Sequence, residues 1–83
     1  MTNLNQSELV SLIEKALEVE QGKVSMETKA KDIEKWDSLG HLSILVALDK
    51  HYDGKVSGIH QIATADSVSK IAELLQKKSL LNP

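Results

Sequence analysis

One serine in this sequence stands where the chain could hold an anion. Ser38 follows Asp37 and precedes Leu39, where a polar stretch of chain gives way to a strongly apolar one. If a helix begins there, its free N–H groups and the positive end of its dipole favour a group such as a phosphodiester. Leu39 would offer a modifying enzyme an apolar surface, and Asp37 would cap the helix or present a carboxylate. Because either polar residue could also be a simple N-cap, the tripeptide alone does not decide between these roles.

The neighbours of this tripeptide each leave two roles open. Trp36 either packs into the core beneath the preceding loop, which its large burial area favours, or forms part of a docking surface. Gly40 costs a helix up to about 1 kcal/mol relative to alanine, which indicates either a close approach of another group or simple tolerance in a first turn. His41 could approach an anion on Ser38 from the same helix face, although a surface histidine more often has no role. The three histidines of the chain lack the spacing of a metal site.

The residues before the tripeptide predict a long helix and a long loop. The spacing of apolar residues predicts a helix over residues 6–20, with Asn5 and Glu8 as a capping box and Gly22 as the stop. Residues 23–35 then form a polar loop, and a loop of this length in a small domain is often functional. The expected inner face of the helix is Leu9, Val10, Ile13, Ala16 and Leu17, and the residues expected to fix the loop to the core are Val24, Met26, Ala30 and Ile33.

The second half of the chain predicts three more helices. The most apolar one covers residues 38–52, and the turn Asp53-Gly54 ends it. A short helix is expected over residues 58–63, followed by a last helix that Asp66 caps and that ends near residue 77 or 78. The expected buried faces are Leu39, Leu42, Leu45, Val46, Leu48 and Tyr52 in the central helix, Ile59 and Ile62 in the short one, and Val68, Ile71, Ala72 and Leu75 in the last.

These elements predict an all-α fold, a four-helix bundle with three longer helices, one short third helix and a long loop between the first two. Residues 1–83 are expected to form one domain, with an ordered core over about 5–78 and a short tail over 79–83, because 83 residues support one modest core. With two aromatic residues and no phenylalanine, that core must be built from aliphatic side chains.

Composition narrows the classes of function. A net charge of −2 gives no footprint for nucleic acid, and the longest apolar run, residues 44–48, is too short to span a membrane. Residues 1–8 lack the basic and apolar regions of a signal peptide, so we expect a cytoplasmic protein. We also expect the protein to be a monomer. The chain contains no cysteine, so any thiol chemistry must come from a group added to the protein.

The run Asp-Ile-Glu-Lys-Trp-Asp-Ser-Leu-Gly-His-Leu over residues 32–42, with the apolar helix that continues to Tyr52-Asp53, resembles acyl carrier proteins and the related peptidyl carrier domains. In that family the loop before the second helix ends in Asp-Ser-Leu, and its serine is where a 4′-phosphopantetheine arm is attached. The resemblance therefore implies attachment at Ser38, with Asp37 and Leu39 completing the motif. It also covers the helix order, and so nearly the whole chain.

The resemblance implies a carrier without catalytic activity of its own. A phosphopantetheinyl transferase would attach the arm from coenzyme A, which makes the holo form a phosphoprotein. A ligase would load an acyl or aminoacyl group as a thioester, and a transferase or synthase would take it onward. Carriers of fatty-acid synthesis have acidic second helices, whereas here Gly40, His41 and Ser43 follow the motif. This favours a free-standing specialised carrier of a polysaccharide, lipid-modification or secondary-metabolite pathway.

Two other classes of function remain as alternatives. Ser38, His41 and an acidic partner could in principle form a hydrolase site, but a chain of 83 residues leaves little room for an oxyanion hole and a substrate pocket. The other alternative is an unmodified helical interaction module that has the carrier fold and no arm.

Overall fold

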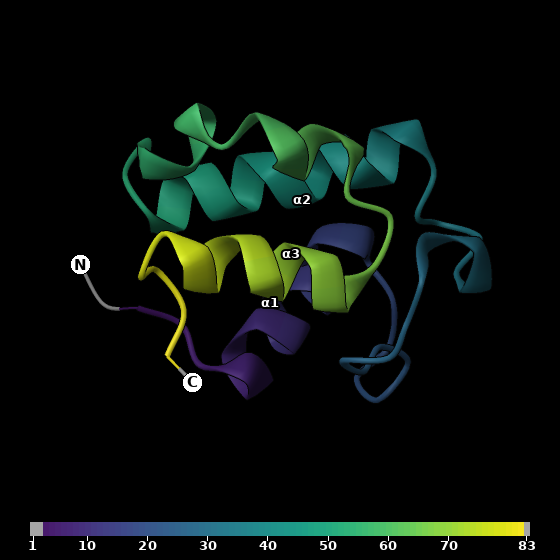
Figure 1. Ribbon diagram of the computed structural model, residues 1–83. Coiled ribbons are helices and arrows are strands. Elements are labelled where there is room, and N and C mark those ends of the chain that lie inside the picture. Colours follow the sequence, from purple (N-terminus) through teal and green to yellow (C-terminus); the bar gives the residue numbers. More distant parts are fainter. Residues whose placement is uncertain (1–2, 83) are drawn as a thin grey trace.

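The computed structural model describes residues 3–82, so the outermost residues of the predicted domain and of its tail, 1, 2 and 83, lie outside the described range. Within that range the protein is all-helical, as predicted, and contains no strand beyond isolated bridges. Three α-helices pack together, and two short 3₁₀ segments occupy the place of the predicted short third helix (Figure 1). The elements are α1 (Gln6–Leu17), η1 (Ala30–Asp32), α2 (Ser38–His51), η2 (Lys55–Gly58), η3 (His60–Thr64) and α3 (Val68–Lys77).

The first helix begins as predicted and ends earlier. Asn5 is its N-cap, and the capping box is complete: Asn5 Oδ1 accepts a hydrogen bond from the Glu8 N–H at 2.8 Å, and Glu8 Oε1 accepts one from the Asn5 N–H at 3.0 Å. The predicted stop at Gly22 is wrong. The helix ends at Leu17, because Glu18 takes up the left-handed conformation with φ 58°.

The buried carboxylate of Glu14 accounts for this early stop. Its Oε2 accepts hydrogen bonds from the backbone N–H groups of Gly22 at 2.8 Å and Val24 at 3.1 Å. An acidic side chain is rarely buried unless it is partnered in this way. The chain after α1 is thus folded back onto the helix it has just left, which starts the long loop in a fixed direction.

Several loop residues reach the core, and the loop is tied to α3. Val24 is buried, and Met26, Ala30 and Ile33 are partly buried against the core, as predicted. The loop also forms an antiparallel bridge between Lys29 and Ser67, a link that the sequence did not suggest. The bridge is supported by two backbone hydrogen bonds, from Ala30 N–H to Asp66 C=O at 2.7 Å and from Val68 N–H to Thr28 C=O at 3.0 Å.

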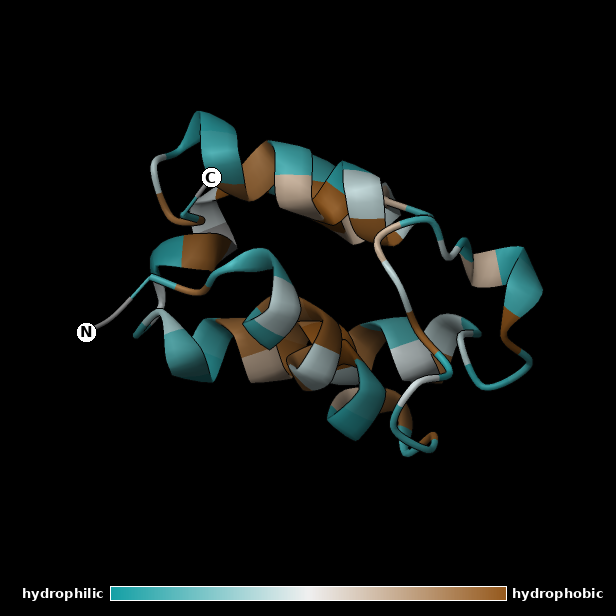
Figure 2. Cartoon of the chain, turned by 90° about the horizontal axis from the view of Figure 1, so that it is seen from below, coloured by the Kyte–Doolittle hydropathy of each residue, from teal (hydrophilic) through white to brown (hydrophobic). Residues whose placement is uncertain are grey.

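The helix α2 contacts α1, η2 and η3, but the face it buries differs from the predicted one. Ile44, Leu48 and Tyr52 are fully buried, four residues apart along one stripe. The prediction omitted Ile44 because α2 is apolar on nearly every side, so hydrophobicity alone does not select a face. Figure 2 shows the hydrophobic residues concentrated on the helices. The large apolar side chains left exposed are Leu39 at 75%, Leu42 at 54% and Val46 at 47%.

In the last part of the chain the predicted residues are buried, but the N-cap of α3 differs from the predicted one. The turn after α2 is at Asp53 and Gly54, both with positive φ, as predicted. The N-cap of α3 is Ser67, whose Oγ accepts from the Lys70 N–H at 3.2 Å, so the predicted cap at Asp66 is wrong by one residue. The predicted inward residues are buried, namely Ile59, Ile62, Val68, Ile71, Ala72 and Leu75.

Both chain ends join the core through Tyr52. The fully buried Tyr52 phenol donates a hydrogen bond to the Leu80 carbonyl at 2.6 Å and accepts one from the Leu4 N–H at 3.3 Å. Leu4 and Leu81 form a parallel bridge, and both side chains are buried. The packed core therefore extends beyond residues 5–78 on both sides, because one phenol holds both ends.

Because the Tyr52 phenol is buried, its titration should make the free energy of unfolding depend on pH. Burial raises the pKa of its phenol above the ordinary 10.0, with the Glu8 charge adding to the rise and the Leu4 bond opposing it. The unfolded chain therefore loses this proton first, and the stabilisation is lost as pH rises past 10. We expect Tyr52→Phe to lower the free energy of unfolding at pH 7 by about 1–2 kcal/mol, because the backbone groups of Leu4 and Leu80 lose a partner.

Urea unfolding at several pH values, with and without this substitution, tests the prediction. As the solution becomes alkaline, the free energy of unfolding should fall more steeply in the wild type than in Tyr52→Phe. Lysines titrate in both proteins, so the difference between the two slopes reports on Tyr52. Equal slopes in the two proteins would contradict it.

Candidate functional site

The predicted tripeptide lies at the first turn of α2, and the structure separates the roles of its residues. Asp37 is the N-cap: its Oδ1 accepts a hydrogen bond from the Gly40 N–H at 2.8 Å. Ser38 is the first helical residue, and its side chain is exposed. No hydrogen bond within residues 3–82 engages its hydroxyl. The simple interpretation of the motif as a cap therefore applies to Asp37 and leaves Ser38 without a structural task.

The first turn of α2 keeps two donors free beside that hydroxyl. The N–H of Gly40 is bonded to the Asp37 side chain, and the N–H of His41 donates to the Asp37 carbonyl at 2.8 Å. Within the described chain, the N–H groups of Ser38 and Leu39 have no acceptor. Together with the positive end of the helix dipole, such groups stabilise a negative charge carried on the first residue.

Gly40 lies where the loop passes close to the helix. A Cβ atom added at this position would meet the Lys35 carbonyl oxygen and would lie 2.9 Å from Leu17 Cδ2. Of the two roles left open for this glycine, the close approach is therefore the one that the structure shows. The approaching group is the protein's own backbone, so Gly40 permits the loop to pass directly over the first turn of α2.

Trp36 and His41 form a hydrogen-bonded pair beside that turn. Trp36 is buried, in agreement with its predicted core role. Its Nε1–H donates to His41 Nδ1 at 3.0 Å, and His41 Nε2 lies 2.8 Å from the Ile62 carbonyl oxygen. Both ring nitrogens of His41 are thus engaged, and neither is bonded to Ser38. The arrangement that a hydrolase needs between these two side chains is absent from the described residues.

Two adjoining hollows are lined by α2, and one of them lies beside Ser38. The first, of about 590 Å³, is a groove bounded by Ser38 and His41 on α2 and by Thr64 and Ala65 on the opposite side. Asp37 and Asp66 are the carboxylates that line it.

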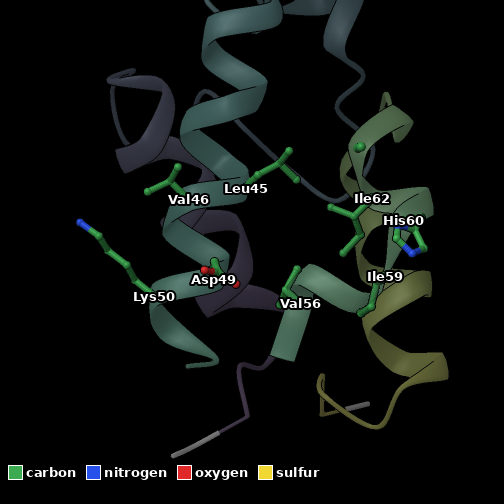
Figure 3. Close-up of a pocket in the computed structure, with 9 residues that line it drawn as sticks. Leu45, Val46, Asp49, Lys50, Val56, Ile59, His60 and Ile62 are labelled. Atoms are coloured by element: carbon green, nitrogen blue, oxygen red, sulfur yellow. The ribbon is translucent and has the colours of Figure 1, made fainter. Parts of the chain in front are cut away.

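The second hollow is an apolar cavity of about 430 Å³ between α2 and the two 3₁₀ segments. Leu45 and Ile62 face each other across it, with Val56 and Ile59 at one end (Figure 3). Leu45 and Ala63 line both this apolar cavity and the groove, so the two hollows share a wall and together extend from Ser38 along α2.

The described residues hold no other recognisable centre of chemistry. Among them no three histidine or acidic side chains are grouped as a metal site would require, and no helix is long and apolar enough to cross a membrane. His60 is exposed.

Comparison of the chain with models of protein families, with curated proteins and with solved structures gave no match.

The sequence located the tripeptide and missed the contacts that hold it. The Trp36–His41–Ile62 chain of hydrogen bonds joins residues that are 5 and 21 positions apart, and no local pattern signals such a link. The contact at Gly40 had a signal, since a glycine in the first turn of an otherwise apolar helix is unfavourable without a reason.

The contact at Gly40 predicts an unusual effect of alanine. Helix propensity alone would make Gly40→Ala stabilising by up to about 1 kcal/mol. Because the added methyl group meets backbone, we expect instead a loss of about 1–3 kcal/mol in the free energy of unfolding, the usual range for overpacking. The loop before Ser38 should also be displaced, which the chemical shifts of residues 35–39 would report.

Gly58→Ala is the matched control, since a Cβ atom there has no neighbour within 4 Å. We expect it to be neutral or slightly stabilising in the same urea titrations. A Gly40→Ala protein as stable as the wild type would show that the contact is easily relaxed.

Proposed function

We propose that this protein is a carrier that holds an acyl or aminoacyl group as a thioester on a 4′-phosphopantetheine arm attached to Ser38. Its partners would be a phosphopantetheinyl transferase, a ligase that loads the cargo, and a transferase or synthase that receives it. The protein would form and break no bonds itself; it would supply attachment, orientation and recognition.

The observation that carries this proposal is the state of the Ser38 hydroxyl. It is exposed at the start of a well-formed helix, and the cap that a serine could have provided is already made by Asp37. A residue without a structural task, placed beside two free backbone N–H groups, is well suited to carry a phosphodiester. The resemblance of the surrounding motif to carrier proteins supplies the identity of the group.

Attachment of the arm has a simple chemical balance. The Ser38 oxygen would form a bond to the phosphorus next to the pantetheine unit of coenzyme A, and the P–O bond to the nucleotide part would break. The nucleotide part of coenzyme A leaves with its own phosphate group, which keeps the oxygen that bridged the two phosphorus atoms. The hydroxyl proton of Ser38 passes to a base of the transferase. The resulting diester bears one negative charge next to the Ser38 and Leu39 N–H groups, which favours the modified state.

The groove and the apolar cavity offer a route for the arm and its cargo. An arm on Ser38 enters the groove at once, because Ser38 lines it. The shared wall at Leu45 and Ala63 leads on to the apolar cavity, where aliphatic side chains would shelter an apolar cargo from water. Ile59, Ile62, Ala63 and Ala65 all line one hollow or both, and Ile59, Ile62 and Ala65 also belong to the packed core.

The finer features of the family belong to the same proposal. We place η2 and η3 as the counterpart of the short third helix in a bundle of the acyl-carrier type. We also propose a cytoplasmic monomer, with no role in binding nucleic acid.

Transfer of the arm in vitro tests the proposal. Incubated with coenzyme A and a transferase of broad specificity, the wild type should gain the mass of one phosphopantetheinyl group, and Ser38→Ala should gain none. Ser43→Ala is the matched control, since it removes another exposed serine from the same helix and should be modified fully.

The outcome also separates the carrier from the alternative of an unmodified interaction module. A wild type that gains no group would favour the module. A Ser38→Ala protein modified to the same extent as the wild type would show that the arm, if it exists, is elsewhere.

The charge of α2 bears on which enzymes would use the carrier. No Asp, Glu, Lys or Arg occurs from Ser38 to Leu48, and the first such residue of the helix is Asp49. The exposed side of this stretch is instead apolar, with Leu39, Leu42 and Val46 outward. Partner enzymes with basic docking surfaces would gain little electrostatic steering from it. We therefore propose a specialised pathway in place of general fatty-acid synthesis.

A ketosynthase of fatty-acid synthesis tests the proposal of a specialised pathway. We expect it to use the loaded carrier poorly, with weak dependence on salt, because steering by charge is missing. Ser43→Glu places a carboxylate on the exposed side of α2 and should raise kcat/KM by a factor of about 2–10 while making it more sensitive to salt. Efficient elongation of the wild type would contradict the specialised assignment.

A further inference from the structure

The hydrogen bonds around His41 join three separate parts of the chain. Trp36 belongs to the loop, His41 to the first turn of α2, and Ile62 to η3. The Trp36 and His41 rings are nearly parallel, with 12° between their planes and 6.2 Å between their centres. We call this set of three groups, Trp36 Nε1–H, the His41 imidazole and the Ile62 carbonyl, the latch.

The latch requires one form of the imidazole. An indole N–H only donates and a carbonyl only accepts, so His41 Nδ1 must be the acceptor and Nε2 must carry the hydrogen. Only the neutral ring with its proton on Nε2 satisfies both bonds. A glutamine amide also has one acceptor and one donor and can replace both bonds, whereas alanine can replace neither.

The bond from His41 to Ile62 is placed to control the position of η3. Within residues 3–82 it is the one hydrogen bond that links α2 to η3. η3 also packs against α2 and α3, and its Ile62 side chain is buried. The same Ile62 carbonyl also accepts the Ala65 N–H at 3.2 Å, so the group that His41 holds is part of the 3₁₀ turn itself.

The two residues joined by that hydrogen bond, His41 and Ile62, line different hollows. The His41 side chain lines the groove beside Ser38, and Ile62 lines the apolar cavity. In Figure 3, Ile62 forms the wall opposite Leu45, so movement of η3 away from α2 would widen the space between these two residues. The latch therefore spans the boundary at which the groove meets the apolar cavity.

We propose that the latch limits how far η3 can separate from α2, and so sets the size of the apolar group that the cavity admits. His41 acts here as a positioning residue, because it works through the Ile62 carbonyl and not on a reacting atom. The identification of this apolar group with the cargo rests on the proposed carrier function, whereas the control of the cavity by His41 concerns the unmodified protein.

The experiment uses the unmodified full chain and the neutral fluorescent probe N-phenyl-1-naphthylamine. We expect His41→Ala to bind the probe about two- to tenfold more tightly than the wild type, the ratio that corresponds to the net strength of one hydrogen bond. His41→Gln should restore affinity to near the wild-type value. Ser43→Ala, two residues further along α2, should leave it unchanged.

Hydrogen exchange separates the latch from a general loss of stability. In His41→Ala the amide of Ala65, which bonds to the Ile62 carbonyl, should exchange faster, while amides in the middle of α1 and α3 keep their protection. Trp36→Phe removes only one of the two bonds and should show a smaller effect, which provides a second variant if His41→Ala folds poorly.

Three results would overturn the proposal. The first is unchanged probe affinity and exchange in His41→Ala, the second is faster exchange to the same extent throughout the protein, and the third is a His41→Gln variant that behaves like alanine. None of these depends on Ser38, so a failure to attach the arm leaves this test intact, and a failed latch leaves the attachment test intact.

Discussion

The passage of the Lys35 carbonyl over the Cα atom of Gly40 is the contact on which the rest of the site depends. It brings the end of the loop against the first turn of α2, and only a residue without a side chain permits it. Once the loop is held there, Asp37 is in position to cap the helix and Trp36 points into the core. Ser38 is then left exposed at the helix start, with nothing in the described structure that uses its hydroxyl.

The rest of the fold supports this contact by fixing the loop at its start and in its middle. The buried carboxylate of Glu14 directs the chain as it leaves α1, and the bridge between Lys29 and Ser67 ties its middle to the start of α3. A loop of this length would otherwise sample many conformations at a large entropic cost to any defined site. The polar composition of the loop conceals these anchors, because most of them are backbone groups.

The sequence predicted what depends on local patterns. The capping box at Asn5, the turn at Asp53 and the inner face of α3 follow from neighbouring residues, and all three are confirmed. Features that depend on distant partners were missed or misplaced. The stop of α1 was placed at Gly22 because no sequence pattern shows that the Glu14 side chain would turn back to bind the loop.

The central helix shows a different limit of such prediction. Its pattern placed Leu42 and Val46 in the core because α2 is apolar on nearly all sides, and only packing in the folded molecule determines that Ile44 is buried. The excess of apolar surface is meaningful in itself, because it leaves a neutral exposed stripe beside Ser38. For the site, the motif identified Ser38, whereas the link from Trp36 through His41 to Ile62 needed three-dimensional information.

The intact mass of the protein isolated from the cells that produce it naturally tests most directly whether Ser38 carries an arm. If the protein is a carrier, part or all of the population should carry one phosphopantetheinyl group, with or without a thioester cargo, and fragmentation should place it on Ser38. A population that has only the unmodified mass in growing cells, or a group located on any other residue, would contradict the account.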